Sequence, residues 1–107
     1  MKARWLRHLS SYEVRLVEKE LLGQYKDPKT GRMCWHWGDC DLEEKVIRIR
    51  RDLTFIDKVW TLVHELTHAE NPEMEEDDVY ELGYHLFDGL SRRSMRVLTK
   101  YLDEAGE

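Results

Sequence analysis

In the stretch "TFIDKVWTLVHELTHAENPEMEEDDVYELG", residues 54–83, the spacing of apolar side chains changes from that of strands to that of helices. Apolar side chains in its first half recur at helical spacing, which predicts an amphipathic helix over residues 54–69. Asn71 and Pro72 then interrupt the pattern. Because asparagine is a good helix cap and proline suits the first helical position, a second helix is expected to begin there. The apolar stripe of this second helix consists of Val79, Leu82, Leu86 and Leu90.

The residues before this stretch show the two-residue alternation of strands. Residues 12–17 alternate apolar with charged side chains, and residues 45–50 do so most clearly. The aromatic-rich residues 33–37 predict a further strand, and the Gly38-Asp39 pair that follows is typical of a turn, with a longer connection that includes residues 41–44 as the alternative. The N-terminal half is therefore expected to form a small antiparallel or mixed sheet.

The last part of the chain predicts a short third helix, at about residues 94–103, which would bury Met95, Leu98 and Leu102. Strands come first and helices follow, which predicts an α+β fold. A chain of 107 residues without repeats or a long linker suits one domain, residues 1–107.

Composition and charge narrow the class of protein. No apolar run approaches the roughly 18 residues that a membrane span needs, and the N-terminus has no apolar stretch typical of a secretion signal, so a cytoplasmic protein is expected. Cys34 and Cys40 are then expected to be free thiols. Residues 52–107 carry 5 basic and 14 acidic side chains, which favours a cation there and makes nucleic acid an improbable partner of that surface.

Two histidines four residues apart, His64 and His68, form an HExxH motif with Glu65. On a helix, residues four apart lie one above the other, so the two imidazoles can bind one metal ion. Both histidines lie on the side of the predicted helix opposite its apolar stripe, which argues against a pair of core histidines. The alternative is a pair of solvent-exposed histidines without a ligand.

The acidic run that opens the second helix offers a third ligand. Glu76 flanks the apolar stripe that must pack on a neighbouring element, whereas Asp77 and Asp78 point away from it. Glu75 is also well placed. Glu76 is therefore the predicted third ligand, and Glu75 is the alternative.

A second metal site would need Cys34, His36 and Cys40, which lie close together in the sequence. Three such ligands do not complete a structural zinc site, which normally has four. A hairpin with buried aromatic side chains is the favoured interpretation of this segment.

The motif and the glutamate after it resemble those of gluzincin metallopeptidases. In that family the glutamate opens a pattern E-x-x-x-x-x-[FL]-[GA], which Glu76, Leu82 and Gly83 match. The run over residues 38–87 is similar to small HExxH metallopeptidases of bacteriophage and prophage genomes, and more distantly to the ImmA/IrrE and SprT-like peptidase groups.

The resemblance implies a minimal zincin-like domain in which His64, His68 and Glu76 bind Zn²⁺. The interval from His68 to Glu76 is much shorter than in large gluzincins, which would place the ion in a tight corner between two helices. Gluzincins often carry an aspartate four residues after the glutamate, which orients a histidine ligand. Tyr80 occupies that position here, so the support would have to come from another residue.

The function expected from these residues is a zinc metallopeptidase that acts on a peptide or protein substrate. The ion would polarise the scissile carbonyl and lower the pKa of its water. Glu65 would be the general base. The strand at residues 45–50 could add a peptide strand if its edge is free, and Tyr80 or Tyr84 would stabilise the oxyanion.

Two alternatives stay open. In a zinc-stabilised interaction module without catalysis, Glu75 or Asp77 would close the coordination as a fourth ligand. Hydrolysis of a bond other than a peptide bond is also compatible, because HExxH defines the chemistry better than the substrate. The sequence predicts neither the cleavage specificity nor the oligomeric state.

Overall fold

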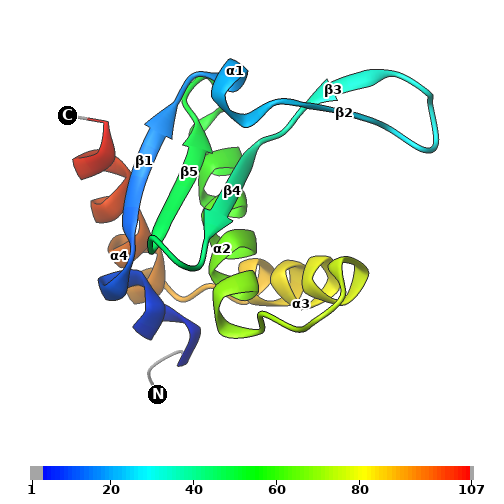
Figure 1. Cartoon of the computed structure of the whole chain (residues 1–107). Helices are drawn as coiled ribbons and strands as arrows, with labels where there is room; N and C mark the ends of the chain where they lie inside the picture. The colour runs from blue at the N-terminus through cyan, green and yellow to red at the C-terminus, as the bar shows by residue number, and fades with distance from the viewer. Residues whose placement is uncertain (1–3, 107) are drawn as a thin grey trace.

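A computed structural model describes residues 4–106, without the side chains of Arg4, Trp5 and His8. A small mixed sheet and a two-stranded arm, both from the N-terminal half, precede three longer helices (Figure 1), which confirms the predicted α+β class. The elements are, in chain order, the 3₁₀ helix η1 (Arg4–Ser11), β1 (Glu13–Val17), α1 (Lys19–Leu22), β2 (Gln24–Lys26), β3 (Met33–Trp35), β4 (Gly38–Asp41), β5 (Val46–Arg50), α2 (Phe55–Glu70), α3 (Glu76–Asp88) and α4 (Arg92–Ala105).

Three strands form the sheet in the order β1-β5-β4, with β1 parallel and β4 antiparallel to β5. Ile47 and Ile49 of β5 are fully buried, while Arg48 and Arg50 on the other face are partly exposed. The alternation predicted for residues 45–50 is thus confirmed. Because β5 is the central strand, its edges are both paired, and it has no free edge for a peptide. The edge strand on the side of the arm is β4.

The turn predicted at Gly38-Asp39 is wrong, because these residues begin β4. The turn lies at residues 42–45 instead. A Cβ added at Gly38 would lie 2.6 Å from Thr61 Cγ2 and 2.7 Å from the carbonyl oxygen of Arg48. Glycine is needed here because β4 approaches α2 and β5 closely, not because the chain reverses.

Helix α2 confirms the prediction for residues 54–69. The Thr54 side chain caps it by accepting a hydrogen bond from the backbone N–H of Asp57 at 3.3 Å. In Figure 1, α2 lies behind the sheet, where it contacts β4 and β5. Its fully buried apolar side chains are Val59, Leu62, Val63 and Leu66. This face and the inner face of the sheet form the core of the protein.

The link between α2 and α3 differs from the prediction. Asn71 ends α2 rather than capping α3, because its side-chain amide donates back to the Thr67 carbonyl at 3.0 Å. Pro72 lies in the turn that follows, and α3 begins only at Glu76. An asparagine beside a proline is compatible with either arrangement locally, and the packing of α3 on α2 selects this one.

The two C-terminal helices complete the core. Val79 of α3 is fully buried. The third predicted helix is real but longer than residues 94–103, and the Ser91 hydroxyl caps α4 by accepting from the backbone N–H of Ser94 at 3.1 Å. Leu98 and Leu102 of α4 join the core as predicted. None of the helices within residues 4–106 combines the length and the apolar character that a membrane crossing requires.

Strands β2 and β3 pair antiparallel and form an arm that projects from the body of the protein (Figure 1). The prediction of a hairpin with buried aromatic side chains at residues 34–40 is wrong: β3 pairs with β2 and not with β4, Trp35 is only half-buried and Trp37 is 41% exposed. Tyr25 of β2 is 43% exposed as well. Two strands alone make no core of their own that could bury these rings. The arm therefore leaves large apolar side chains in contact with solvent.

Candidate metal centre

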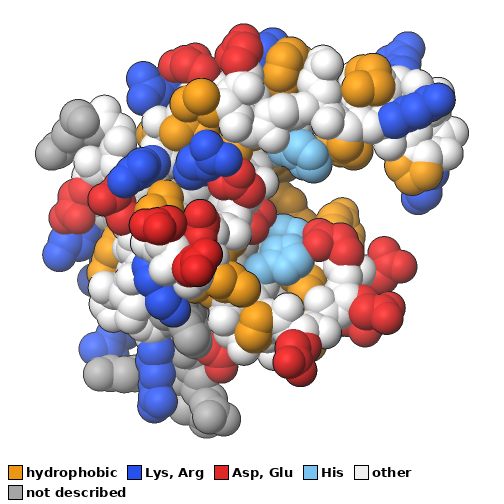
Figure 2. Space-filling view, viewed as in Figure 1, with side chains coloured by type: hydrophobic (Ala, Val, Ile, Leu, Met, Phe, Trp, Pro, Cys, Tyr) orange, Lys and Arg blue, Asp and Glu red, His pale blue; other side chains and the backbone are white. Residues whose placement is uncertain are grey.

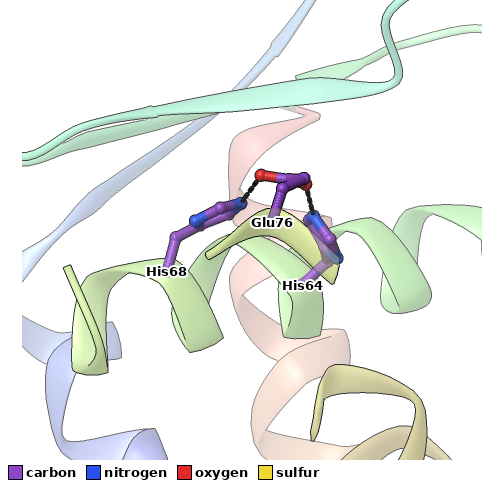
Figure 3. Close-up of side chains that lie close together, drawn as sticks. All are labelled: His64, His68 and Glu76. Atoms are coloured by element: carbon purple, nitrogen blue, oxygen red, sulfur yellow. Dashed lines mark hydrogen bonds and ion pairs between the residues drawn. The ribbon is translucent and has the colours of Figure 1, made fainter. Parts of the chain in front are cut away.

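The three side chains predicted as metal ligands lie together between α2 and α3 (Figure 3). His64 and His68 project from successive turns of α2, and Glu76 is the first residue of α3. The Nε2 atom of His64 lies 3.0 Å from Oε1 of Glu76, and Nε2 of His68 lies 3.0 Å from Oε2. One ligand atom from each residue lies within 4.8 Å of the other two.

This donor set fits a divalent metal ion. Zinc binds nitrogen and oxygen at about 2.0–2.2 Å, so two ligand atoms in a tetrahedral site lie about 3.3–3.6 Å apart. The two histidine–glutamate contacts are 3.0 Å long, and no two ligand atoms of the set are more than 4.8 Å apart. These distances bracket the tetrahedral spacing, so small side-chain rotations would bring the three atoms to the positions that a zinc ion requires. Two imidazoles and one carboxylate suit zinc and related transition metals better than calcium or magnesium.

The neighbouring carboxylates do not belong to this set of candidate ligands. Among the side chains that the structure describes, His64, His68 and Glu76 are the only set of three or more histidine, cysteine or acidic residues placed to bind one ion. The alternative ligand Glu75 is the residue that precedes α3, and neither it nor Asp77 belongs to the set.

The second metal site considered from the sequence is not assembled either, since Cys34, His36 and Cys40 form no such set among the described residues. Cys34 Sγ lies 3.8 Å from the Arg32 carbonyl oxygen. Both cysteines are free thiols, as predicted.

His64 is suited to a metal through its protonation state. Its side chain is only 15% exposed, and this burial lowers its pKa below the ordinary value of 6.5, although the contact with Glu76 opposes the effect. The imidazole is therefore neutral near pH 7, as a metal ligand must be. Its Nδ1 atom is buried and has no hydrogen-bond partner among the described residues. In gluzincins an aspartate at the position of Tyr80 often orients a histidine ligand. None of the described residues makes the corresponding hydrogen bond to His64 Nδ1.

Glu65 follows His64 in the chain but does not belong to the candidate metal-binding set. It is 7% exposed, although it lies on a wall of the cleft described below. Burial raises its pKa to about 8, and the negative charges of Asp39 and Glu76 add to the shift. In the metal-free protein at neutral pH this carboxyl is mostly protonated. A cation bound beside it would favour its ionised form.

A cleft of about 920 Å³ runs over His64, His68 and Glu76. Figure 2 shows it as a hollow with histidine side chains on both walls. The body of the protein and the base of the arm both contribute to its walls. The residues that line it are Leu22, Tyr25, His36, Trp37, Gly38, Asp39, Cys40, Leu42, Trp60, Thr61, His64, Glu65, His68, Pro72, Glu76 and Tyr80.

Aromatic rings gather at the His64 end of this cleft. Trp60, one turn before His64, has ring centroids of Tyr80, Tyr84 and Phe87 at 5.4, 6.3 and 5.6 Å. Tyr80 lines the cleft and Tyr84 does not, so Tyr80 is the better placed of the two residues considered for the oxyanion.

The sequence did not indicate His36 and Asp39 as residues of the cleft. The Gly38-Asp39 pair has the pattern of a turn, which hides strand β4; Asp39 lies on that strand and His36 lies just before it. A signal was present: Asp39 faces Arg48 on β5, and its carboxylate accepts a hydrogen bond from Arg48 Nε at 2.9 Å. Opposite charges at such positions are typical of paired strands.

No family model, curated protein or solved structure matches the chain. Its function is therefore inferred from its own side chains.

Proposed function

We propose that the protein is a zinc-dependent peptidase in which His64, His68 and Glu76 hold the ion. The observation that carries this proposal is the convergence of the three donors on the floor of an open cleft, beside a buried glutamate that is not in the set. The resemblance of the sequence pattern to gluzincins supports the same assignment. Zinc, when bound, would supply Lewis-acid activation of the scissile carbonyl and of a water molecule.

Glu65 is the general base under this proposal. Its carboxylate accepts a proton from the attacking water and returns it to the leaving amine. Because the side chain is buried and lines the cleft, it is held in place and shielded from bulk solvent.

The substrate lies along β4 in this proposal. β4 pairs with β5 on one side only, and Gly38, Asp39 and Cys40 line the cleft. An extended peptide can form main-chain hydrogen bonds with such an edge strand. Trp60 and Tyr80 then offer an apolar wall beside the ligands for a large side chain of the substrate.

The alternative, a structural zinc module, requires a closed coordination shell with a fourth protein ligand. Within the described residues no fourth donor joins the set, which favours the enzyme.

We expect Glu76→Ala to weaken zinc binding much more than Asp77→Ala or Asp78→Ala. All three carboxylates are exposed in the first turn of α3, so each replacement should change helix stability by a similar, small amount. Only Glu76 contacts both histidines. Zinc titration against a competing chelator measures the affinities.

Two results would change this assignment. Equal losses of affinity from all three variants would mean that the acidic run attracts cations without a defined ligand. A loss confined to Glu75→Ala would move the ligand to the residue before α3.

A further inference from the structure

The arm formed by β2 and β3 ends in a basic tip, which we define as Lys26, Lys29 and Arg32. Residues 26–32 carry these three basic side chains and one acidic side chain, Asp27. Lys26, Lys29 and Arg32 are exposed, and within the described part of the chain no carboxylate forms an ion pair with any of them. By contrast, Arg15, Arg48 and Arg50 of the sheet each contact a carboxylate. The tip is thus a group of cations without an internal partner.

The opposite rim of the cleft is acidic. Residues 73–78, which end in the first turn of α3, carry five acidic side chains and no basic one. In Figure 2, blue side chains gather at the far end of the arm and red ones gather below it at the start of α3, with the hollow between them. The two walls of the cleft therefore carry opposite charge, positive at the tip of the arm and negative at the start of α3.

The arm belongs to the cleft as well as to the surface. Tyr25 of β2 and His36, which follows β3, both line the cleft, and their rings lie 4.7 Å apart. Only His36 and Trp37 separate β3 from β4, the proposed substrate edge. At about 3.3 Å per residue, the six residues from Gly38 back to Arg32 reach about 20 Å. A bound peptide of several residues beyond the scissile bond is long enough to reach the tip.

We propose that the basic tip is a specificity element that selects peptide segments with acidic side chains on the arm side of the scissile bond. This inference rests on the proposed peptidase function. Residues 73–78 carry four acidic side chains besides the proposed zinc ligand Glu76. They strengthen the selection, because they repel the same carboxylates when a peptide lies in the opposite direction. The recognised substrate class is a peptide that is acidic on one side only of its cleavage site.

The test uses two fluorescent peptides with the same apolar centre and an acidic tract placed before or after it, and a third peptide with a neutral tract. Binding to the zinc-loaded protein is measured by anisotropy in a Glu65→Gln background, and hydrolysis is measured with Glu65 present. The arm variant is Lys26→Glu/Lys29→Glu/Arg32→Glu. Its matched control, Arg92→Glu/Arg93→Glu/Arg96→Glu, reverses three exposed arginines on α4.

With the unaltered arm, we expect the affinities for the two acidic peptides, with the tract before or after the apolar centre, to differ by about tenfold. This is the combined effect of a few exposed ion pairs. The preference should weaken as salt is added. The arm variant should lose or reverse it, and the α4 variant should keep it. The neutral peptide should bind to the parent, the arm variant and the α4 variant with the same affinity, and the three proteins with Glu65 present should cleave it at the same rate.

Two outcomes separate this proposal from the function it rests on. If the neutral peptide is cleaved but the arm variant discriminates as the parent does, or the parent does not discriminate, the tip is no specificity element. If arm-dependent binding is seen without hydrolysis of any peptide, the arm recognises acidic segments and the peptidase assignment is wrong.

Discussion

Replacing Glu65 by glutamine is expected to lower peptide hydrolysis by roughly 10²-fold or more, the scale of a lost general base. Glutamine keeps the size of the side chain but cannot take the proton from water. Zinc content and melting temperature should change little, because Glu65 is outside the set of ligands and its carboxyl is mostly protonated at neutral pH in the metal-free protein. A mixed peptide library, incubated with each protein and analysed by mass spectrometry, gives the measurement.

Zinc content and melting temperature are measured on the same samples, so that a loss of hydrolysis can be separated from a loss of metal or of folding. Equal cleavage by the parent and the variant would exclude Glu65 as the base. No cleavage by either protein, with zinc held in a closed shell of four protein ligands, would favour the structural module instead.

Removing the metal is expected to lower the melting temperature strongly, because the ligands join α2 to α3. Zinc at a free concentration of 100 times its dissociation constant adds about 2.7 kcal/mol to the free energy of unfolding. For a domain of this size that corresponds to roughly 10–20 °C. Differential scanning calorimetry with zinc and with chelator measures the shift, and a shift of zero would contradict a metal that links the two helices.

His68→Ala should have the effect of chelation. Loss of an outer-shell partner already costs about 10–100-fold in metal affinity, so loss of a ligand should cost at least that much. His85→Ala is the matched control, since this histidine is exposed on α3 and lies outside the set. The His68 variant with zinc should melt close to the chelated parent, and the His85 variant should melt with the zinc-loaded parent.

The gap between the zinc-loaded and chelated melting temperatures should widen from about pH 6 to about pH 8. The pKa of Glu65 in the folded, metal-free protein is about 8, above the ordinary 4.5. Its contribution to stability is therefore full below about pH 4.5 and is lost as the pH rises through about 8. Zinc favours the ionised carboxylate and the neutral histidines, so it offsets this loss. In Glu65→Gln the widening should be smaller.

Helix α2 and its histidines could be predicted from the sequence because local signals agree with the packing. The apolar spacing of Val59, Leu62 and Leu66 matches the buried face, and Thr54 is an N-cap that the chain uses. Once the helix is defined, the positions of His64 and His68 follow from its geometry.

Other parts depend on contacts between distant residues. Asn71 is a good cap for a following helix, and Pro72 suits its first position. In the structure, however, the Asn71 side-chain amide donates to the Thr67 carbonyl, and α3 begins only at Glu76. Glycine at position 38 is typical of a turn. In the structure it is needed because strand β4 passes too close to Thr61 of α2 for a side chain to fit. The course of the arm could not be predicted, because nothing in β2 or β3 indicates that Tyr25 and Met33 remain exposed to solvent.

The most direct test of the central claim is X-ray absorption spectroscopy of the protein loaded with zinc and dialysed. The proposed centre predicts one zinc per chain, bound by two imidazoles and oxygen at about 2.0–2.2 Å. His64→Ala should remove one imidazole from the spectrum or the metal from the protein. A protein that retains no zinc, or zinc bound to sulfur at about 2.3 Å through Cys34 or Cys40, would contradict it.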